Sequence, residues 1–210
     1  MTIEDAMDAY ERATFGGEAA AVGEGELLLD AVDARSALAR GWLRHARFLA
    51  ERRPEEAELT AFRRAAELFA ALGDAAGEAE ARFGIGLYHQ VVAGDTAAAV
   101  AEFERSRAMA EEAGAGLVLS YALRHLAFAD ADAGRFDAAR EGFAASLSLR
   151  QQAGHAPATA AAHLALAELA LRTGDAGTAA SELAQARALA AECGARGVLG
   201  WCDAVENEPR

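Results

Sequence analysis

The chain has 210 residues and a mass of 21.8 kDa, with 53% hydrophobic and 25% charged residues and a net charge of −13. This length and composition indicate a folded globular protein with a continuous core. No apolar run approaches the ~18–20 residues of a membrane span. The acidic balance argues against direct binding to nucleic acid, which depends on Lys and Arg contacts to phosphates.

The start of the chain and its cysteines predict a cytoplasmic protein. Residues 1–12 are acidic and lack the basic region and apolar stretch of a signal peptide. Cys193 and Cys202 are too few for a disulfide framework and lack the spacing of metal ligands. We therefore expect ordinary thiols in a reducing compartment and no association with a membrane.

Residues 1–33 are predicted to form N-terminal helices. The apolar spacing of a short amphipathic helix is present at Ile3, Ala6, Met7 and Tyr10, and two glycines then end it. A second helical segment follows, so this region has the layout of a truncated first repeat. No strong breaker separates Val32 from Ala37, which leaves open that the second helix continues into the next one.

A unit of about forty residues recurs through residues 34–194. Glycines end helix-length apolar segments at intervals of 41, 40 and 40 residues, at Gly73, Gly114, Gly154 and Gly194. A second set lies about midway, at Gly94, Gly134 and Gly174, and Arg53-Pro54 occupies the equivalent place in the first unit. Two breakers per unit predict an all-α solenoid of stacked antiparallel helix hairpins. We expect four helix pairs in residues 34–194, and a capping helix and tail in residues 195–210.

One unit carries an extra residue. The interval from Gly73 to Gly94 is 21 residues, whereas the corresponding intervals in the later units are 20. The extra residue falls near residues 89–93. We expect it to form either a helix bulge or a longer turn.

Several columns of the repeat hold small and large apolar residues at fixed spacing. A small residue precedes a large one by four positions in Ala99-x3-Phe103, Ala139-x3-Phe143 and Ala179-x3-Leu183. A branched residue precedes a small one in the helices before them, at Ile85-Gly86, Leu126-Ala127 and Leu166-Ala167. With the turns at Gly94-Asp95 and Gly174-Asp175, these columns resemble the tetratricopeptide repeat (TPR) over about residues 34–194. The resemblance implies a right-handed superhelical solenoid of antiparallel helix hairpins.

The sequence departs from this family in two respects. Its period is about 40 residues rather than 34, and glycine stands where the family has a terminal proline. Longer units of this kind resemble the repeat regions of large bacterial transcriptional regulators and signalling ATPases, which implies a regulatory role. Neither a helix-turn-helix nor a phosphate-binding loop accompanies them in this sequence.

The resemblance also implies a binding groove, because the first helix of each TPR pair lines the concave face. The motif Leu43-Arg44-His45-x-x-Phe48 recurs 80 residues later as Leu123-Arg124-His125-x-x-Phe128. The predicted groove residues are Arg44, Phe48, Phe83, Tyr88, Tyr121, Arg124, Phe128, Glu168 and Arg172. Aromatic faces beside arginine forks suit an acidic ligand, such as a peptide carboxylate or an anionic metabolite. The alternative is that these motifs repeat through shared ancestry, with the phenylalanines in the core and the arginines solvated.

The other polar residues give weaker signals. No histidine or cysteine has the spacing of a metal site, so we expect no cofactor and read the histidines as packing residues. Ser106 and Ser146 occupy a small-residue column and need no role as nucleophiles. Asp130 and Asp132 precede Gly134 at a helix C-terminus, where negative charge is unfavourable, so we expect them to meet an arginine or a ligand.

These features favour a TPR adaptor or scaffold that binds a protein or peptide segment, such as an acidic one, and that is not an enzyme. The first alternative is a sensor or atypical enzyme, in which a closed pocket holds a small anionic molecule and His45 or His125 acts as acid or base. The second is self-association into a homodimer through uncapped ends of the solenoid, such as the one at Trp201.

Overall fold

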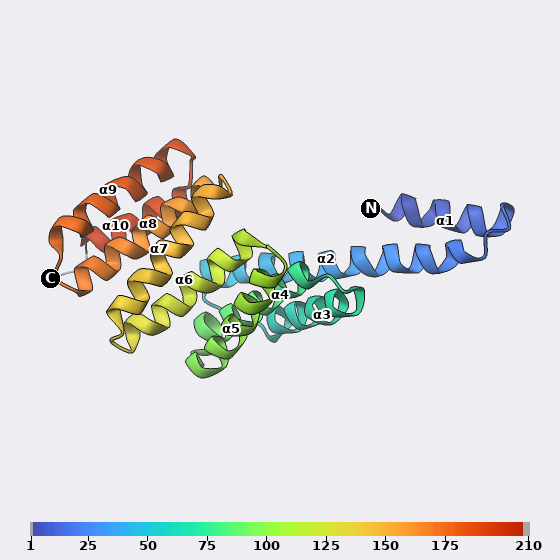
Figure 1. Ribbon diagram of the computed structural model, residues 1–210, viewed down its shortest axis with the longest axis horizontal. Coiled ribbons are helices and arrows are strands. Elements are labelled where there is room, and N and C mark those ends of the chain that lie inside the picture. The colour runs from blue at the N-terminus through green and yellow to red at the C-terminus, as the bar shows by residue number, and fades with distance from the viewer. Residues whose placement is uncertain (1, 208–210) are drawn as a thin grey trace. The chain divides into compact units, whose positions relative to one another are not determined.

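The computed structural model describes residues 2–207, and these residues form helices with no strand among them. The prediction of an all-α fold is confirmed. Within each of the two compact units of the chain, consecutive helices lie side by side (Figure 1). In chain order the elements are α1 (Ile3–Phe15), α2 (Ala20–Glu51), α3 (Glu56–Leu72), α4 (Ala75–Leu87), the π-helix η1 (Tyr88–Ala93), α5 (Thr96–Glu112), α6 (Gly116–Asp132), α7 (Phe136–Gln152), α8 (Ala156–Arg172), α9 (Ala176–Glu192) and α10 (Arg196–Asn207).

The predicted forty-residue unit is present in the backbone. All seven glycines that were expected to end helices have a left-handed conformation, with φ between 64° and 78°. Several of the following helices then start on a side-chain cap, as at Asp95 and Asp175, whose carboxylates accept a hydrogen bond from a backbone N–H three residues on. Glycine adopts this φ without strain and so ends one helix, and the capping aspartate begins the next. The glycine and aspartate in the sequence therefore account for these turns.

The N-terminal region differs from the expectation that the helices of residues 1–33 are separate from the first helix pair, which was expected to begin at residue 34. α2 is one continuous helix from Ala20 to Glu51, so the predicted limit between residues 33 and 34 lies inside it. The alternative in which the helix continues is therefore confirmed. The physical reason is that strong helix formers (Leu, Ala and Arg) make up most of residues 27–40 and that the first proline after them is Pro54.

The extra residue of the second unit forms a helix bulge. Residues Tyr88–Ala93 have π-helical geometry, and the backbone N–H of Gly94 bonds to the carbonyl of His89. A π-helical turn holds one more residue than an α-helical turn, so it keeps the helix in register with the rest of the repeat. The first of the two predicted alternatives is thus correct.

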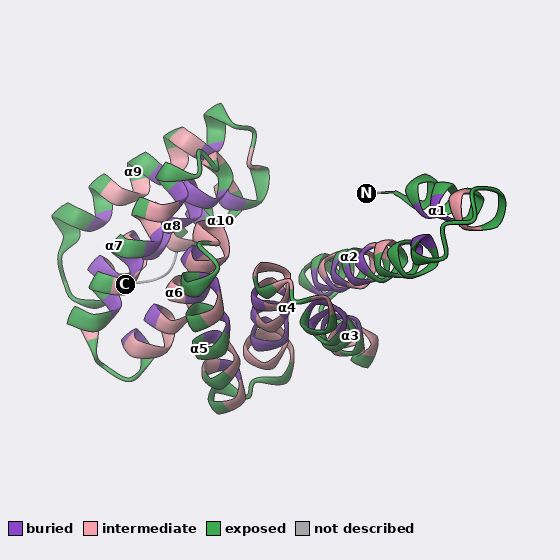
Figure 2. Cartoon of the chain, turned by 45° about the vertical axis from the view of Figure 1, so that its right-hand side comes forward, coloured by how far each residue is buried: buried purple, intermediate pink, exposed green. Residues whose placement is uncertain are grey.

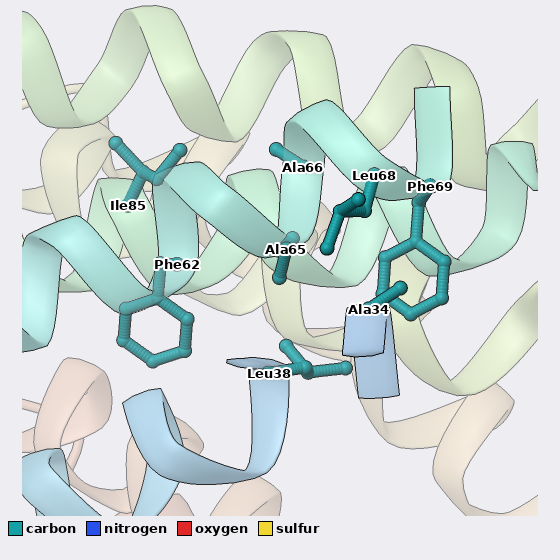
Figure 3. Close-up of a cluster of buried hydrophobic side chains, with 9 residues drawn as sticks. Ala34, Leu38, Phe62, Ala65, Ala66, Leu68, Phe69 and Ile85 are labelled. Carbon is teal, nitrogen blue, oxygen red and sulfur yellow. The ribbon is translucent and has the colours of Figure 1, made fainter. Parts of the chain in front are cut away.

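The chain divides into two compact units, Met1–Ala113 and Gly114–Arg210. In unit 1, α2 packs against α1 and α3, and α4 packs against α3 and α5. Its main core cluster, drawn in Figure 3, centres on Phe62 and Phe69 of α3, which meet Ala34 and Leu38 of α2. Phe62 is fully buried, and its ring lies against two glycines, Gly41 and Gly84.

In unit 2, α8 is the central helix. It packs against α7 and α9, and it also contacts α6 and α10. Alanines fill most of its buried positions, which lets four neighbours approach closely. α10 confirms the predicted C-terminal helix, since Val198 and Cys202 are buried in a cluster with residues of α8 and α9. No helix in the described part of either unit is long and apolar enough to cross a membrane.

Arg52 ends α2 in the left-handed conformation, with φ of 55°, at the place where the other hairpins have glycine. Arg52→Gly should therefore stabilise the protein by about 1 kcal/mol, because a side chain in this conformation costs about 1–2 kcal/mol. Urea denaturation would measure the change. Arg53→Gly is the matched control, since Arg53 has no positive φ, and it should give no gain. Equal effects of the two variants would contradict this account.

Candidate functional site

A pocket of about 290 Å³ lies in unit 2, where α6, α7, α8 and α10 meet. Its apolar wall includes Phe128 of α6, Phe143 of α7 and Leu169 of α8. The polar groups are Glu168 and Arg172, both on α8. The complete lining is Phe128, Ala131, Phe143, Ala165, Glu168, Leu169, Leu171, Arg172 and Val205. Three residues predicted for the groove, Phe128, Glu168 and Arg172, therefore line one pocket.

Arg172 is held in place by the end of α6. Its Nη1 donates to Oδ1 of Asp132 at 2.8 Å, and its Nη2 donates to the carbonyl of Ala131 at 2.8 Å. Asp130 likewise pairs with Arg135, with 2.6 Å between Oδ1 and Nη2. The expectation that Asp130 and Asp132 meet arginines is confirmed. Because the guanidinium donates both to a carboxylate and to a carbonyl at the C-terminal end of α6, Arg172 presents a fixed donor group to the pocket.

Arg124 lies one helical turn before Phe128, and its guanidinium carbon is 4.7 Å from the centre of the Phe128 ring. Its Nε is buried and has no hydrogen-bond partner within residues 2–207. Burial lowers the pKa of Arg124 to about 10, and the negative charge of Glu168 acts in the opposite direction. Arg124 is therefore a desolvated cation that its surroundings compensate incompletely.

Arg150 of α7 is a buried arginine near Arg124, and the sequence analysis missed it. Only 2% of its surface is exposed. Its Nε donates to Oγ of Ser120 at 3.2 Å, and its Nη1 donates to the carbonyl of Ala158 at 2.8 Å. The guanidinium also lies 5.0 Å from the centre of the Tyr121 ring. Burial and the charge of Arg124 together lower the pKa of Arg150 to about 9.

The repeat does contain a signal for Arg150. The residue four positions before the closing glycine is Phe69, Ala110 and Ala190 in the other units, and all three are buried. An arginine in a column of buried apolar residues breaks the pattern. It carries a desolvation cost that packing alone does not explain, which makes it a candidate for function.

The four groove residues predicted in unit 1 have structural contacts there. Phe48 and Phe83 are buried, so they pack against neighbouring groups and do not form an open surface. Arg44 donates from Nη1 to the carbonyl of Ala57 at 2.7 Å, which ties α2 to the start of α3. Tyr88 lies on η1, with its ring 5.9 Å from that of His89. The alternative of phenylalanines in the core fits this unit, whereas Tyr121, Arg124, Phe128, Glu168 and Arg172 come together in unit 2.

Two of the histidines form pairs with glutamates between neighbouring helices. His45 Nδ1 is 2.9 Å from Oε1 of Glu58, which is fully buried. His163 Nδ1 is 2.7 Å from Oε2 of Glu182. No group of three or more potential metal ligands occurs among the residues that the structure describes. The hydroxyls of the small-residue column also serve packing, since Ser146 donates to the carbonyl of Ser120 at 2.7 Å.

A second hollow, of about 570 Å³, lies in unit 1 between α2 and α3. It is lined mainly by Leu27, Leu28, Phe69 and Leu72. Two of its three charged residues have structural contacts, since Glu24 is paired with Arg12 and Asp74 caps α4, and Arg35 is the third. The pocket of unit 2 is the better candidate, because it combines apolar walls with charged groups that converge on it.

No protein-family model matches the chain, and no curated protein sequence is similar to it. The packed helix pairs are consistent with a helical repeat.

Proposed function

We propose that this chain is a TPR-like adaptor that binds an acidic peptide segment of a partner protein at the pocket of unit 2. The observation that carries the proposal is the positive charge beside the pocket. Arg124 and Arg150 are close enough for the charge of Arg124 to lower the pKa of Arg150, and burial lowers the pKa of both, although the negative charge of Glu168 opposes this effect at Arg124. A ligand carboxylate would compensate this charge.

The polar groups of the pocket suit a peptide amide. Glu168 offers an acceptor and Arg172 offers donors on the same helix, and an amide group carries both an N–H and a C=O. The apolar wall formed by Phe128 and Phe143 has room for one side chain. At about 290 Å³ the pocket lies at the lower end of the ~300–1,000 Å³ typical of small-molecule sites, which favours a peptide side chain over a metabolite.

The proposal also includes the architecture and the compartment. The recurring left-handed glycines and the packed helix pairs support the TPR-like solenoid. Cys193 and Cys202 are unpaired thiols, which supports a function in the cytoplasm.

Binding of labelled peptides tests the proposal. The probe is a set of fluorescent peptides rich in Asp and Glu with one central Leu or Phe, compared with the same peptides carrying Asn and Gln. We expect the acidic peptides to bind about 10-fold more tightly, and Arg124→Gln to remove most of that difference, because a charged contact contributes roughly 1.5–3 kcal/mol. Fluorescence anisotropy would measure both effects.

Arg196→Gln is the matched control, since Arg196 is an exposed arginine elsewhere in unit 2 and should leave affinity unchanged. Equal binding of the acidic and amide peptides would refute an acidic ligand. Equal losses in the two variants would show that general charge, and not this pocket, controls binding.

A further inference from the structure

One face of α2 carries exposed apolar residues at heptad spacing. Val22, Leu29 and Leu43 are 54%, 45% and 69% exposed, and Ser36 continues the series between them. Residues seven apart lie on the same side of an α-helix, which makes these four positions a stripe along most of α2. Exposing large apolar side chains to water is unfavourable, and a partner helix packed along the stripe would bury them. The stripe therefore has the pattern of a surface that pairs with another helix.

α1 adds to the same apolar surface. Its small residues Ala6 and Ala9 are buried, whereas Ile3, Met7 and Tyr10 are each more than half exposed. α1 runs back along the N-terminal part of α2 (Figure 1), and exposed residues cover much of its length (Figure 2).

The ion pair of Arg12 with Glu24 marks one side of this hairpin. Helix geometry puts Val22 roughly 160° around α2 from Glu24 and puts Ile3 roughly 180° around α1 from Arg12. The exposed residues of both helices therefore lie on the other side of the hairpin, away from the ion pair.

A column of charged residues flanks the stripe, and its sign changes halfway along. Each member is four residues after a stripe position, and in chain order they are Glu26, Asp33, Arg40 and Arg47. All four side chains are exposed. Glu26, Asp33 and Arg40 form no ion pair within residues 2–207, and Arg47 has only an exposed contact with Glu55, at 3.5 Å. An exposed pair of that kind contributes little to stability.

We propose that this face pairs with α2 of a second copy of the chain, in an antiparallel arrangement centred near Ser36. Antiparallel pairing places the acidic half of one column beside the basic half of the other, so that Glu26 faces Arg47 and Asp33 faces Arg40 across the interface. It also brings Leu29 of one copy near Leu43 of the other. A parallel arrangement would instead put the two columns on opposite sides of the interface, where they could not pair with each other.

Charge reversal tests the pairing. Glu26→Arg with Asp33→Arg makes the column entirely basic, and Arg40→Glu with Arg47→Glu makes it entirely acidic. In sedimentation equilibrium we expect the parent at twice the 21.8 kDa chain mass, each reversed variant at the mass of one chain, and an equal mixture of the two variants again at twice the mass. Circular dichroism would verify that each variant stays helical, which the exposure of all four residues leads us to expect.

A monomeric parent at all concentrations overturns the proposal. Reversed variants that still dimerise would also overturn it, since they would have to pair through another surface, such as the exposed Trp201. A mixture of the two variants that stays monomeric would overturn it as well.

Cross-linking provides an independent measurement of the orientation. Ser36→Cys, in a background with Cys193→Ser, should be joined efficiently by a short bifunctional thiol reagent, since the two copies of residue 36 meet at the two-fold axis. Leu29→Cys in the same background should not be, because antiparallel pairing puts its two copies roughly 21 Å apart along the helix. Efficient cross-linking of Leu29→Cys would show parallel pairing and overturn the proposal.

Discussion

Phe62→Ala should lower the free energy of unfolding by about 3–5 kcal/mol, the cost of deleting a buried aromatic ring. Phe62 is fully buried, and the ring of Trp42 lies 5.0 Å from it in an edge-to-face arrangement. Its ring also occupies the space that a side chain on Gly41 or Gly84 would fill. Three helices of unit 1 therefore meet at this one ring. Urea denaturation would measure the loss.

The same geometry predicts the effect of enlarging the glycines. A methyl group on Gly41 would lie 2.5 Å from the nearest carbon of Phe62, and one on Gly84 would be closer still. Gly84→Ala should therefore cost about 1–3 kcal/mol through overpacking. Combining it with Phe62→Leu should cost less than the two single changes added together, because the smaller side chain makes room for the methyl group.

Gly23 provides the matched control. Like Gly84 of α4 it lies inside a helix, here α2, but no neighbouring atom is within 4 Å of where its side chain would be. Gly23→Ala should stabilise the protein by up to about 1 kcal/mol through helix propensity. If Gly84→Ala were also stabilising, the contact between ring and glycine would not be the feature that holds these helices together.

Part of this core could be read from the sequence, and part could not. The repeat predicted the helices and their turns, because glycine and proline act locally on the backbone, and it placed an extra residue near residues 89–93, where the structure has the bulge at Tyr88–Ala93. The contact of Phe62 with Gly84 joins residues on two different helices. No local pattern encodes such a contact, and only the packed structure reveals it.

The candidate site likewise has some features that the sequence predicted and others that only the packed structure shows. The motif at Arg124 and Phe128 was visible because it repeats, and the resemblance to the TPR family implied that Arg172 would lie near it. Phe48 belongs to the earlier copy of that motif and yet is buried. A motif fixes a position on a helix, whereas the neighbours decide whether that position faces a pocket. Arg150 was missed because hydrophobic periodicity assigns a charged residue to the surface.

Breaking the pair of His45 and Glu58 should be about as costly as losing Phe62. Glu58 is fully buried, its Oε1 is 2.9 Å from Nδ1 of His45, and its Oε2 has no hydrogen-bond partner within the described chain. His45→Ala removes the side-chain partner that the carboxyl group has among residues 2–207. We expect a loss of about 3–5 kcal/mol, the typical result of leaving one member of a buried pair alone.

The fluorescence of Trp42 can report on unfolding of unit 1 near this pair. Trp201→Phe leaves Trp42 as the single tryptophan, and the Trp42 ring is 6.4 Å from that of His45. Fluorescence of Trp42 during urea denaturation therefore reports on the helices that the pair joins. His163→Ala is the control, because its partner Glu182 keeps 20% of its side chain exposed, and water can solvate that carboxylate when the histidine is removed. Its loss should be closer to about 1 kcal/mol.

Replacing both members together separates a packing role from a chemical one. His45→Leu with Glu58→Met puts apolar groups of similar size in the same space, and such replacements of buried pairs are often neutral or stabilising. We expect this double variant to recover most of the stability that His45→Ala loses. A double variant as unstable as His45→Ala would contradict that expectation and show that the pair itself is needed for the fold. If the double variant is stable and still binds the acidic peptides as the parent does, the histidine holds α2 against α3 and takes no part in ligand binding.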